Sequence, residues 1–240
     1  MEQPSLTLDR VVAGMLKNDA CRENSELRQK YAVKIFSVLR VVAKALRRLH
    51  SLGVVHCNLS PEFCGKFGDR WKLLGILRFH RIGDTIDYSS FGQAAPPEAL
   101  DPQISTNNHA LDRQAAFRTN VKVDPSIDIW CFGKLAYDVL VGEPLVPFDS
   151  RKETRQYRKG LNSPRILHLS TLDLVEARRS LRGVGVPLAG VDLITRCLSQ
   201  EPDSRPSSMT EIVRSDIWEG VMGAGPTGTR RKEEAGLHEC

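Results

Sequence analysis

One run in the sequence joins a helix end, a short apolar pair and a polar loop, and it reads Leu49-His50-Ser51-Leu52-Gly53-Val54-Val55-His56-Cys57-Asn58-Leu59-Ser60-Pro61-Glu62-Phe63. Before it, apolar residues from Ile35 to Leu49 recur at intervals of three and four, which predicts a helix buried along one face. Gly53 is expected to end that helix, because glycine is common just past a helix C-terminus. Val54-Val55 then indicates a short extended segment that leads into the loop.

Downstream of the loop, the sequence predicts a small hairpin and several further helices. Residues 63–67 and 71–74 read as extended segments, and the Gly68-Asp69-Arg70 break between them reads as a turn. Asp124-Pro125-Ser126 can start a helix whose residues are apolar on most sides, a pattern typical of the centre of a domain. Further helices are expected near residues 5–18, 170–180, 190–199 and 208–218.

The composition restricts the class of protein. The chain has 240 residues, of which 41% are hydrophobic and 26% charged, as in soluble globular domains. Its net charge of +5 is too small to indicate a nucleic-acid partner. No stretch approaches the ~18 apolar residues of a membrane span, and the N-terminus lacks a secretion signal. Because the 6 cysteines form no CxxC pair, they are typical of reduced thiols. We therefore expect an intracellular, cytoplasmic protein with no membrane or nucleic-acid partner.

Five sequence motifs resemble those of protein kinases and follow the same order along the chain. The loop His56–Phe63 resembles the catalytic loop of that family, H-R-D-L-x-P-E-N. The others are a strand leading to Gly75 at the position of D-F-G, Pro96-Pro97-Glu98 at A-P-E, Asp128–Gly133 at the start of the large central helix, and Cys197–Pro206 near the end of the domain. The resemblance implies a mainly α fold, the large C-terminal lobe of a kinase with a small β-hairpin.

The resemblance extends over residues 1–218, with Met1-Glu2 at the end of the hinge between the two kinase lobes. We expect the small lobe, with its glycine-rich loop and its lysine, to be absent. Residues 101–125 are rich in polar side chains and read as a loop or an insertion, with a short helix near 111–117. Residues 219–240 carry mixed charge and almost no core residues, so they are expected to form a disordered tail.

The positions that carry chemistry in the family hold other residues here. Asn58 stands where the family has its catalytic Asp, and an amide is not a base at physiological pH. Phe63 and Gly75 replace the two residues that hold magnesium, so neither position supplies an oxygen ligand. Cys57 replaces the Arg that pairs with a phosphorylated activation segment. The resemblance therefore implies a degenerate loop that retains His56, and no active catalytic residue, metal, ATP or other cofactor is expected.

The positions that build the kinase scaffold are retained. The resemblance implies that Glu98 and Arg205 form an ion pair, and that Asp128 accepts hydrogen bonds from the backbone of the catalytic loop. Trp130 is expected in the core, and His56 is expected to pack inside the loop. A scaffold that is kept while the chemistry is lost is typical of a pseudokinase, a noncatalytic module that binds another protein.

Two other interpretations stay open. The chain is an unusual protein kinase if a small lobe from outside it supplies the missing ATP contacts. Alternatively, it is part of a longer protein and exposes the face that a small lobe would cover. A Mg·ATP-dependent rise in melting temperature would favour the kinase, and the coding sequence upstream of Met1 tests the second possibility.

Other candidate sites have less support. His56, Cys57 and Cys64 fit no usual zinc spacing, and neighbouring Cys57 and His56 would point apart in extended backbone. Residues 223–229 resemble a P-loop but lack its lysine. Thr85, Tyr88, Ser89 and Ser90 could be phosphorylated, although ordinary loop residues are the simpler interpretation.

Overall fold

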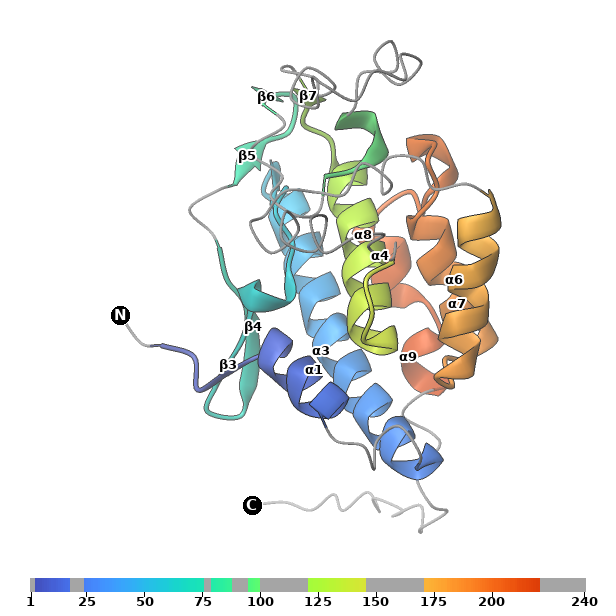
Figure 1. Cartoon of the computed structure of the whole chain (residues 1–240). Coiled ribbons are helices and arrows are strands. Elements are labelled where there is room, and N and C mark those ends of the chain that lie inside the picture. The colour runs from blue at the N-terminus through green and yellow to red at the C-terminus, as the bar shows by residue number, and fades with distance from the viewer. Residues whose placement is uncertain are drawn as a thin grey trace, which may run out of the picture.

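The computed structural model describes residues 3–17, 24–75, 79–87, 95–99, 121–145 and 171–220. Helices dominate these ranges, and the predicted mainly α fold is confirmed (Figure 1). The helices are α1 (Leu8–Lys17), α3 (Ser25–Ser51), α4 (Pro125–Val141), α6 (Thr171–Gly183), α7 (Leu188–Cys197), α8 (Met209–Arg214) and α9 (Ile217–Gly220), with short 3-10 helices η1 (Pro61–Phe63), η4 (Pro97–Ala99) and η6 (Pro202–Ser204). The strands are β1 (Leu6–Thr7), β2 (Val54–Val55), β3 (Cys64–Phe67), β4 (Arg70–Leu73), β5 (His80–Arg81), β6 (Thr85–Ile86) and β7 (Val121–Lys122).

Helix α4 lies at the centre of the described structure and is buried on nearly every side, as predicted. It packs against α1 and α3 on one side and against α6 and α7 on the other (Figure 1). The Asp124 side chain caps its start by accepting a hydrogen bond from the backbone N–H of Ser126 (2.8 Å). Gly133 lets α7 approach closely, because a Cβ there would lie 2.6 Å from the Cβ of Cys197.

Helix α3 begins earlier than the apolar spacing from Ile35 predicted. It starts at Ser25, after Asn24, whose side chain accepts hydrogen bonds from the backbone N–H groups of Glu26 and Leu27. Few residues in these first turns are buried, so apolar periodicity does not mark them. The sequence signal for this start is the N-cap residue Asn24.

The strands are short and form three small antiparallel sheets. The largest has the order β1-β3-β4, and Phe67 pairs with Arg70 across its hairpin. The turn therefore consists of Gly68 and Asp69 alone, and Arg70 belongs to β4 rather than to the predicted turn. Gly68 has a φ of 53°, which favours glycine. Strand β2 pairs with β5, and β6 pairs with β7.

The two C-terminal helices, α8 and α9, pack against α3. The prediction of one helix over 208–218 was wrong in one respect, because the chain leaves the helical conformation at Ser215 and forms two short helices, α8 and α9. Trp218 of α9 packs edge-on against Phe36 of α3, and its indole N–H donates to the carbonyl of Ile212 (2.8 Å). This contact fixes α9 on α3.

Some predictions fall wholly or partly outside the described residues. These include the helix near 111–117, the segment 223–229, most of the 101–125 stretch and most of the 219–240 tail. Where the structure does describe these segments, residues 121–122 form β7 and residues 219–220 end α9. None of the helices in the described ranges has the length and apolarity that crossing a bilayer requires.

Candidate functional site

The loop His56–Asn58 is held by one carboxylate of α4. Asp128 is fully buried and accepts hydrogen bonds from the backbone N–H of His56 (2.8 Å) and of Cys57 (2.9 Å). The ring of His50, at the end of α3, lies 2.9 Å from the same carboxylate. The predicted contact between Asp128 and the loop backbone is therefore present. His50 belongs to the same stretch of sequence, but its contact with Asp128 depends on the tertiary structure.

Cys57 has a left-handed backbone, with a φ of 59°. Such a conformation costs a non-glycine residue about 1–3 kcal/mol, and the two hydrogen bonds to Asp128 hold the loop in it. The assumption of extended backbone at this position was wrong. Burial, and then the charge of Asp128, raise the pKa of the Cys57 thiol far above its ordinary value. The thiol is neutral at physiological pH and is a poor nucleophile.

His56 is the centre of the site. Its Nε2 lies 2.9 Å from the carbonyl oxygen of Leu74, which can only accept, so Nε2 carries the proton. Its Nδ1 accepts a hydrogen bond from the backbone N–H of Asn58 (3.3 Å). Both ring nitrogens of His56 are therefore occupied by hydrogen bonds to the backbone.

The three positions that the sequence singled out for lost chemistry lie around His56. The Asn58 backbone bonds to its ring, and the ring of Phe63 has its centroid 6.1 Å from the ring of His56. A Cβ at Gly75 would lie 3.3 Å from His56 Nε2 and 3.2 Å from the Phe63 ring. We call His56, Asn58, Phe63 and Gly75 the His56 cluster. Phe79 adds a third ring at 5.4 Å from His56, a contact that no sequence motif indicated.

The His56 cluster is poor in groups that could hold a cation. Asn58 supplies at most an amide oxygen, Phe63 supplies carbon atoms, and Gly75 has no side chain. Within the described ranges, no three His, Cys, Asp or Glu side chains are grouped in a way that could bind a metal ion. The backbone at Gly75 has a φ of 88°, a conformation that disfavours a side chain there.

Arg205 and Glu98 form the other part of the site. The buried guanidinium donates to both carboxylate oxygens of Glu98, at 2.8 and 2.7 Å. Its remaining N–H groups donate to the carbonyls of Ser126, Ser199 and Gln200. All five donors of the guanidinium are used, so one side chain joins η4, the start of α4 and the segment after α7.

Trp130 occupies the core of α4, as predicted, and its side chain is completely buried. Its indole N–H has no hydrogen-bond partner among the described residues. Ile76 and Leu77, at the two positions after Gly75, lie outside these residues, as do Tyr88, Ser89 and Ser90. Thr85 is described and is exposed in β6.

Comparison with known proteins supports the resemblance to protein kinases that the sequence motifs indicated. The chain is 31% identical over 145 residues to human serine/threonine-protein kinase Sgk1, covering 60% of this chain and 29% of that protein. It is 29% identical over 181 residues to human serine/threonine-protein kinase H1, covering 73% and 36% of the two chains. This chain has a protein kinase-like fold. The kinase-like chain spans about a third of the length of the curated relatives it matches.

A solved structure extends the fold comparison over almost the whole kinase-like chain. The ROP18 kinase domain, in complex with AMP-PNP and sucrose, superposes with a TM-score of 0.61 at 13% identity. The match covers 93% of the kinase-like chain and 50% of that structure. At this identity the match shows the fold alone. No protein-family model matches the chain.

Proposed function

We propose that the kinase-like chain is a noncatalytic module that binds another protein and does not transfer phosphate. The observation that carries this proposal is the His56 cluster, where an amide, a phenyl ring and a glycine surround an imidazole whose two nitrogens already form hydrogen bonds. Phosphoryl transfer depends on positioning and on metal ions that neutralise the developing charge. The cluster supports neither requirement.

The first argument concerns the proton of the substrate hydroxyl. Asn58 cannot accept that proton, and the loss of a general base typically lowers the rate by ~10²–10⁴-fold. His56 does not replace the base, because its unprotonated nitrogen already accepts the N–H of Asn58 and its side chain is buried.

The second argument concerns magnesium, which prefers oxygen ligands in near-octahedral geometry. Phe63 and Gly75 supply none, and the Phe63 ring stands against the space that a side chain at position 75 would need. A carboxylate at this position would have to displace the ring. The described residues at these two positions therefore contribute packing and supply no charged group that could bind magnesium.

The third argument is that contacts of the kinase scaffold are present although the chemical groups differ. The five bonds of Arg205 and the three contacts of Asp128 join segments that lie far apart in the chain. A rigid, mainly helical body without phosphotransfer chemistry is suited to presenting a surface to another protein. We expect that partner to be neither a nucleic acid nor a membrane, and four buried free thiols support an intracellular setting.

The test combines nucleotide binding with phosphate transfer. The full chain is heated with and without Mg·ATP, with EDTA as the metal-free control, and its transfer of labelled phosphate to casein is measured beside a competent kinase. We expect no change in melting temperature and no incorporation of label. Saturating binding at 100 times Kd would add about 2.7 kcal/mol of stability, or roughly 5–10 °C. Such a rise, or label on casein, would contradict the proposal and favour a kinase.

A further inference from the structure

Helix α6 presents two different faces. Leu174, Ala177 and Leu181 point into the core, where Ala177 and Leu181 are almost fully buried. Val175, Arg178, Arg179 and Arg182 follow the helical spacing i, i+3, i+4, i+7, so they share another face. Three of these four residues are arginines, and all four are exposed.

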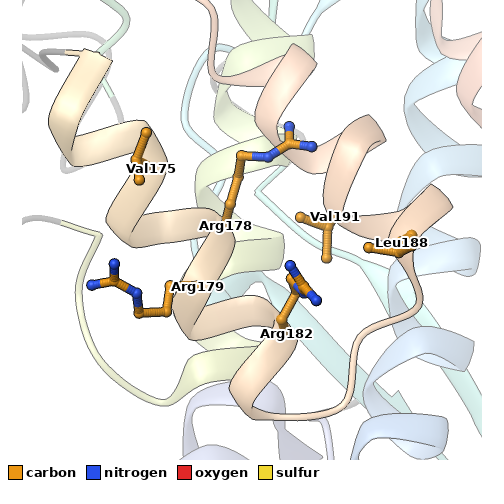
Figure 2. Close-up of a pocket in the computed structure, with 6 residues that line it drawn as sticks. All are labelled: Val175, Arg178, Arg179, Arg182, Leu188 and Val191. Atoms are coloured by element: carbon orange, nitrogen blue, oxygen red, sulfur yellow. The ribbon is translucent and has the colours of Figure 1, made fainter.

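This face forms one wall of a cavity of about 400 Å³ between α6 and α7 (Figure 2). Leu188 and Val191 form the other wall, and we call the cavity the α6–α7 groove. Val191 is fully buried at its base, whereas Val175 and Leu188 are 46% and 62% exposed at its edges. The groove therefore offers an apolar floor and exposed apolar edges with arginines beside them.

The three arginines are not equivalent. Arg178 extends towards α7 (Figure 2). There it pairs with Asp192 and donates to the hydroxyl of Thr195 (2.9 Å), so it holds the two helices together. Arg179 pairs with Glu176 on its own helix, but both side chains are more than half exposed and the pair is weak. Arg182 is exposed, and no ion pair with it is found among the described residues. Arg179 and Arg182 can therefore receive new carboxylate partners.

We propose that the α6–α7 groove docks an acidic segment of a partner protein, which places one aliphatic or aromatic side chain in the groove and carboxylates on Arg179 and Arg182. This rests on the proposed function, that the chain binds protein, and it specifies the surface and the chemistry of the partner. A guanidinium matches a carboxylate with two parallel hydrogen bonds, and the apolar edges gain by leaving water.

A phosphate-based ligand fits this groove less well. Binding to nucleic acid is built from many phosphate contacts, whereas one of the three arginines here is committed to α7 and the floor is apolar. An anionic membrane would require a wider apolar face with basic residues around it. A protein segment can place an apolar side chain in the α6–α7 groove and carboxylates on Arg179 and Arg182.

The test selects peptides with the full chain. A library of random peptides displayed on phage is panned on the immobilised chain, and enriched peptides are labelled and measured by fluorescence anisotropy. We expect enriched sequences with net negative charge and at least one large apolar residue. Arg182→Glu should raise Kd by about 5- to 10-fold, and Leu188→Ser should raise it by a similar factor.

The matched control is Arg47→Glu, which makes the same change of charge at an exposed position of α3 outside the groove. It should change Kd less than about 2-fold, since a distant exposed charge is screened by salt. Circular dichroism melting of every variant shows that it is folded. Enrichment of neutral or basic peptides, equal losses for Arg47→Glu and Arg182→Glu, or displacement of the peptide by duplex DNA or phosphatidylserine vesicles at lower concentration would overturn the groove assignment.

Failure of this proposal can be separated from failure of the proposed function. If the chain transfers phosphate or is stabilised by Mg·ATP, the noncatalytic function is wrong, whatever the peptides show. If it does neither, and the enriched peptides bind a surface that Arg182→Glu and Leu188→Ser leave unaffected, a noncatalytic binding module stands and only the α6–α7 groove is excluded.

Discussion

The His56 cluster and the Glu98–Arg205 pair are both largely buried in the described structure, yet different interactions build them. Every donor of Arg205 has an acceptor, and the pair joins three segments of the chain. In the His56 cluster, by contrast, the side chains at positions 63 and 75 contribute carbon or nothing, and packing replaces charge. The comparison shows that charged hydrogen bonds join distant segments at Arg205, whereas ring packing fills the space around His56.

Removing a member of the Glu98–Arg205 pair should have the largest effect. Arg205→Ala or Glu98→Ala breaks a mostly buried pair, and Arg205→Ala also removes the guanidinium hydrogen bonds to three backbone carbonyls, so we expect a loss of about 3–5 kcal/mol in the free energy of unfolding. Urea denaturation measures this loss. Asn58→Ala, in the His56 cluster, serves as the comparison and should lose under about 1 kcal/mol. Equal small losses for all three variants would refute the contrast between the two regions.

An acidic side chain at position 75 should be resisted by packing. Gly75→Asp forces a side chain onto a φ of 88° and against the Phe63 ring, so we expect a loss of about 1–3 kcal/mol. Adding Phe63→Ala opens the space, and the double variant should lose less than the two single changes together. Thermal and urea melts of the four proteins measure the coupling. Strict additivity would mean that the ring does not limit position 75.

Buried thiols should make the fold sensitive to alkali. Burial is the largest cause that raises the pKa of Cys64 and of Cys197 to about 12 each. The unfolded chain releases these protons at lower pH than the folded chain does, so their contribution to stability is complete below about pH 8.5 and declines as pH rises towards 12. The slope should approach roughly 1.4 kcal/mol per pH unit for each thiol.

Urea midpoints measured between pH 7 and 10.5 test this dependence. Cys64→Ala should flatten the decline, because one of the shifted thiols is gone, although it also costs some packing at every pH. Arg47→Ala, at an exposed position, controls for general effects of high pH. An unchanged slope in Cys64→Ala would show that other groups cause the alkaline loss.

The smallest expected effect is a change in phosphate transfer. The triple variant Asn58→Asp, Phe63→Asn, Gly75→Asp restores the family's chemical groups, yet we expect no phosphate transfer from it in this chain. The reason is that the triphosphate also needs contacts that the described residues do not supply. Transfer of label to casein is the measurement, and a mixture of the chain with casein alone sets the background. Clear incorporation by the triple variant would show that the loop chemistry alone separates this chain from a kinase.

Several features of the fold could be predicted because they depend on local pattern. The apolar surroundings of Asp124-Pro125-Ser126 indicated a buried central helix, and the hairpin over 63–74 followed from its turn residues. The early start of α3 was missed because apolar residues are sparse in its first turns and none of the described side chains there is fully buried. The roles of His50 and Phe79 were missed because each depends on a contact with a residue far away in the chain or outside the motif.

The sequence by itself determined which chemical groups are present, since an amide at 58, a phenyl ring at 63 and a hydrogen at 75 are set by residue identity whatever the fold. Only the tertiary structure decided that these positions meet around His56. It also brought Arg205 to Glu98, 107 positions away, and Asp128 to the backbone of Cys57, 71 positions away. The physical reason is that the covalent structure of each residue fixes its functional group, whereas these contacts depend on how distant segments pack together. The α6–α7 groove likewise exists only because two amphipathic helices meet along one edge.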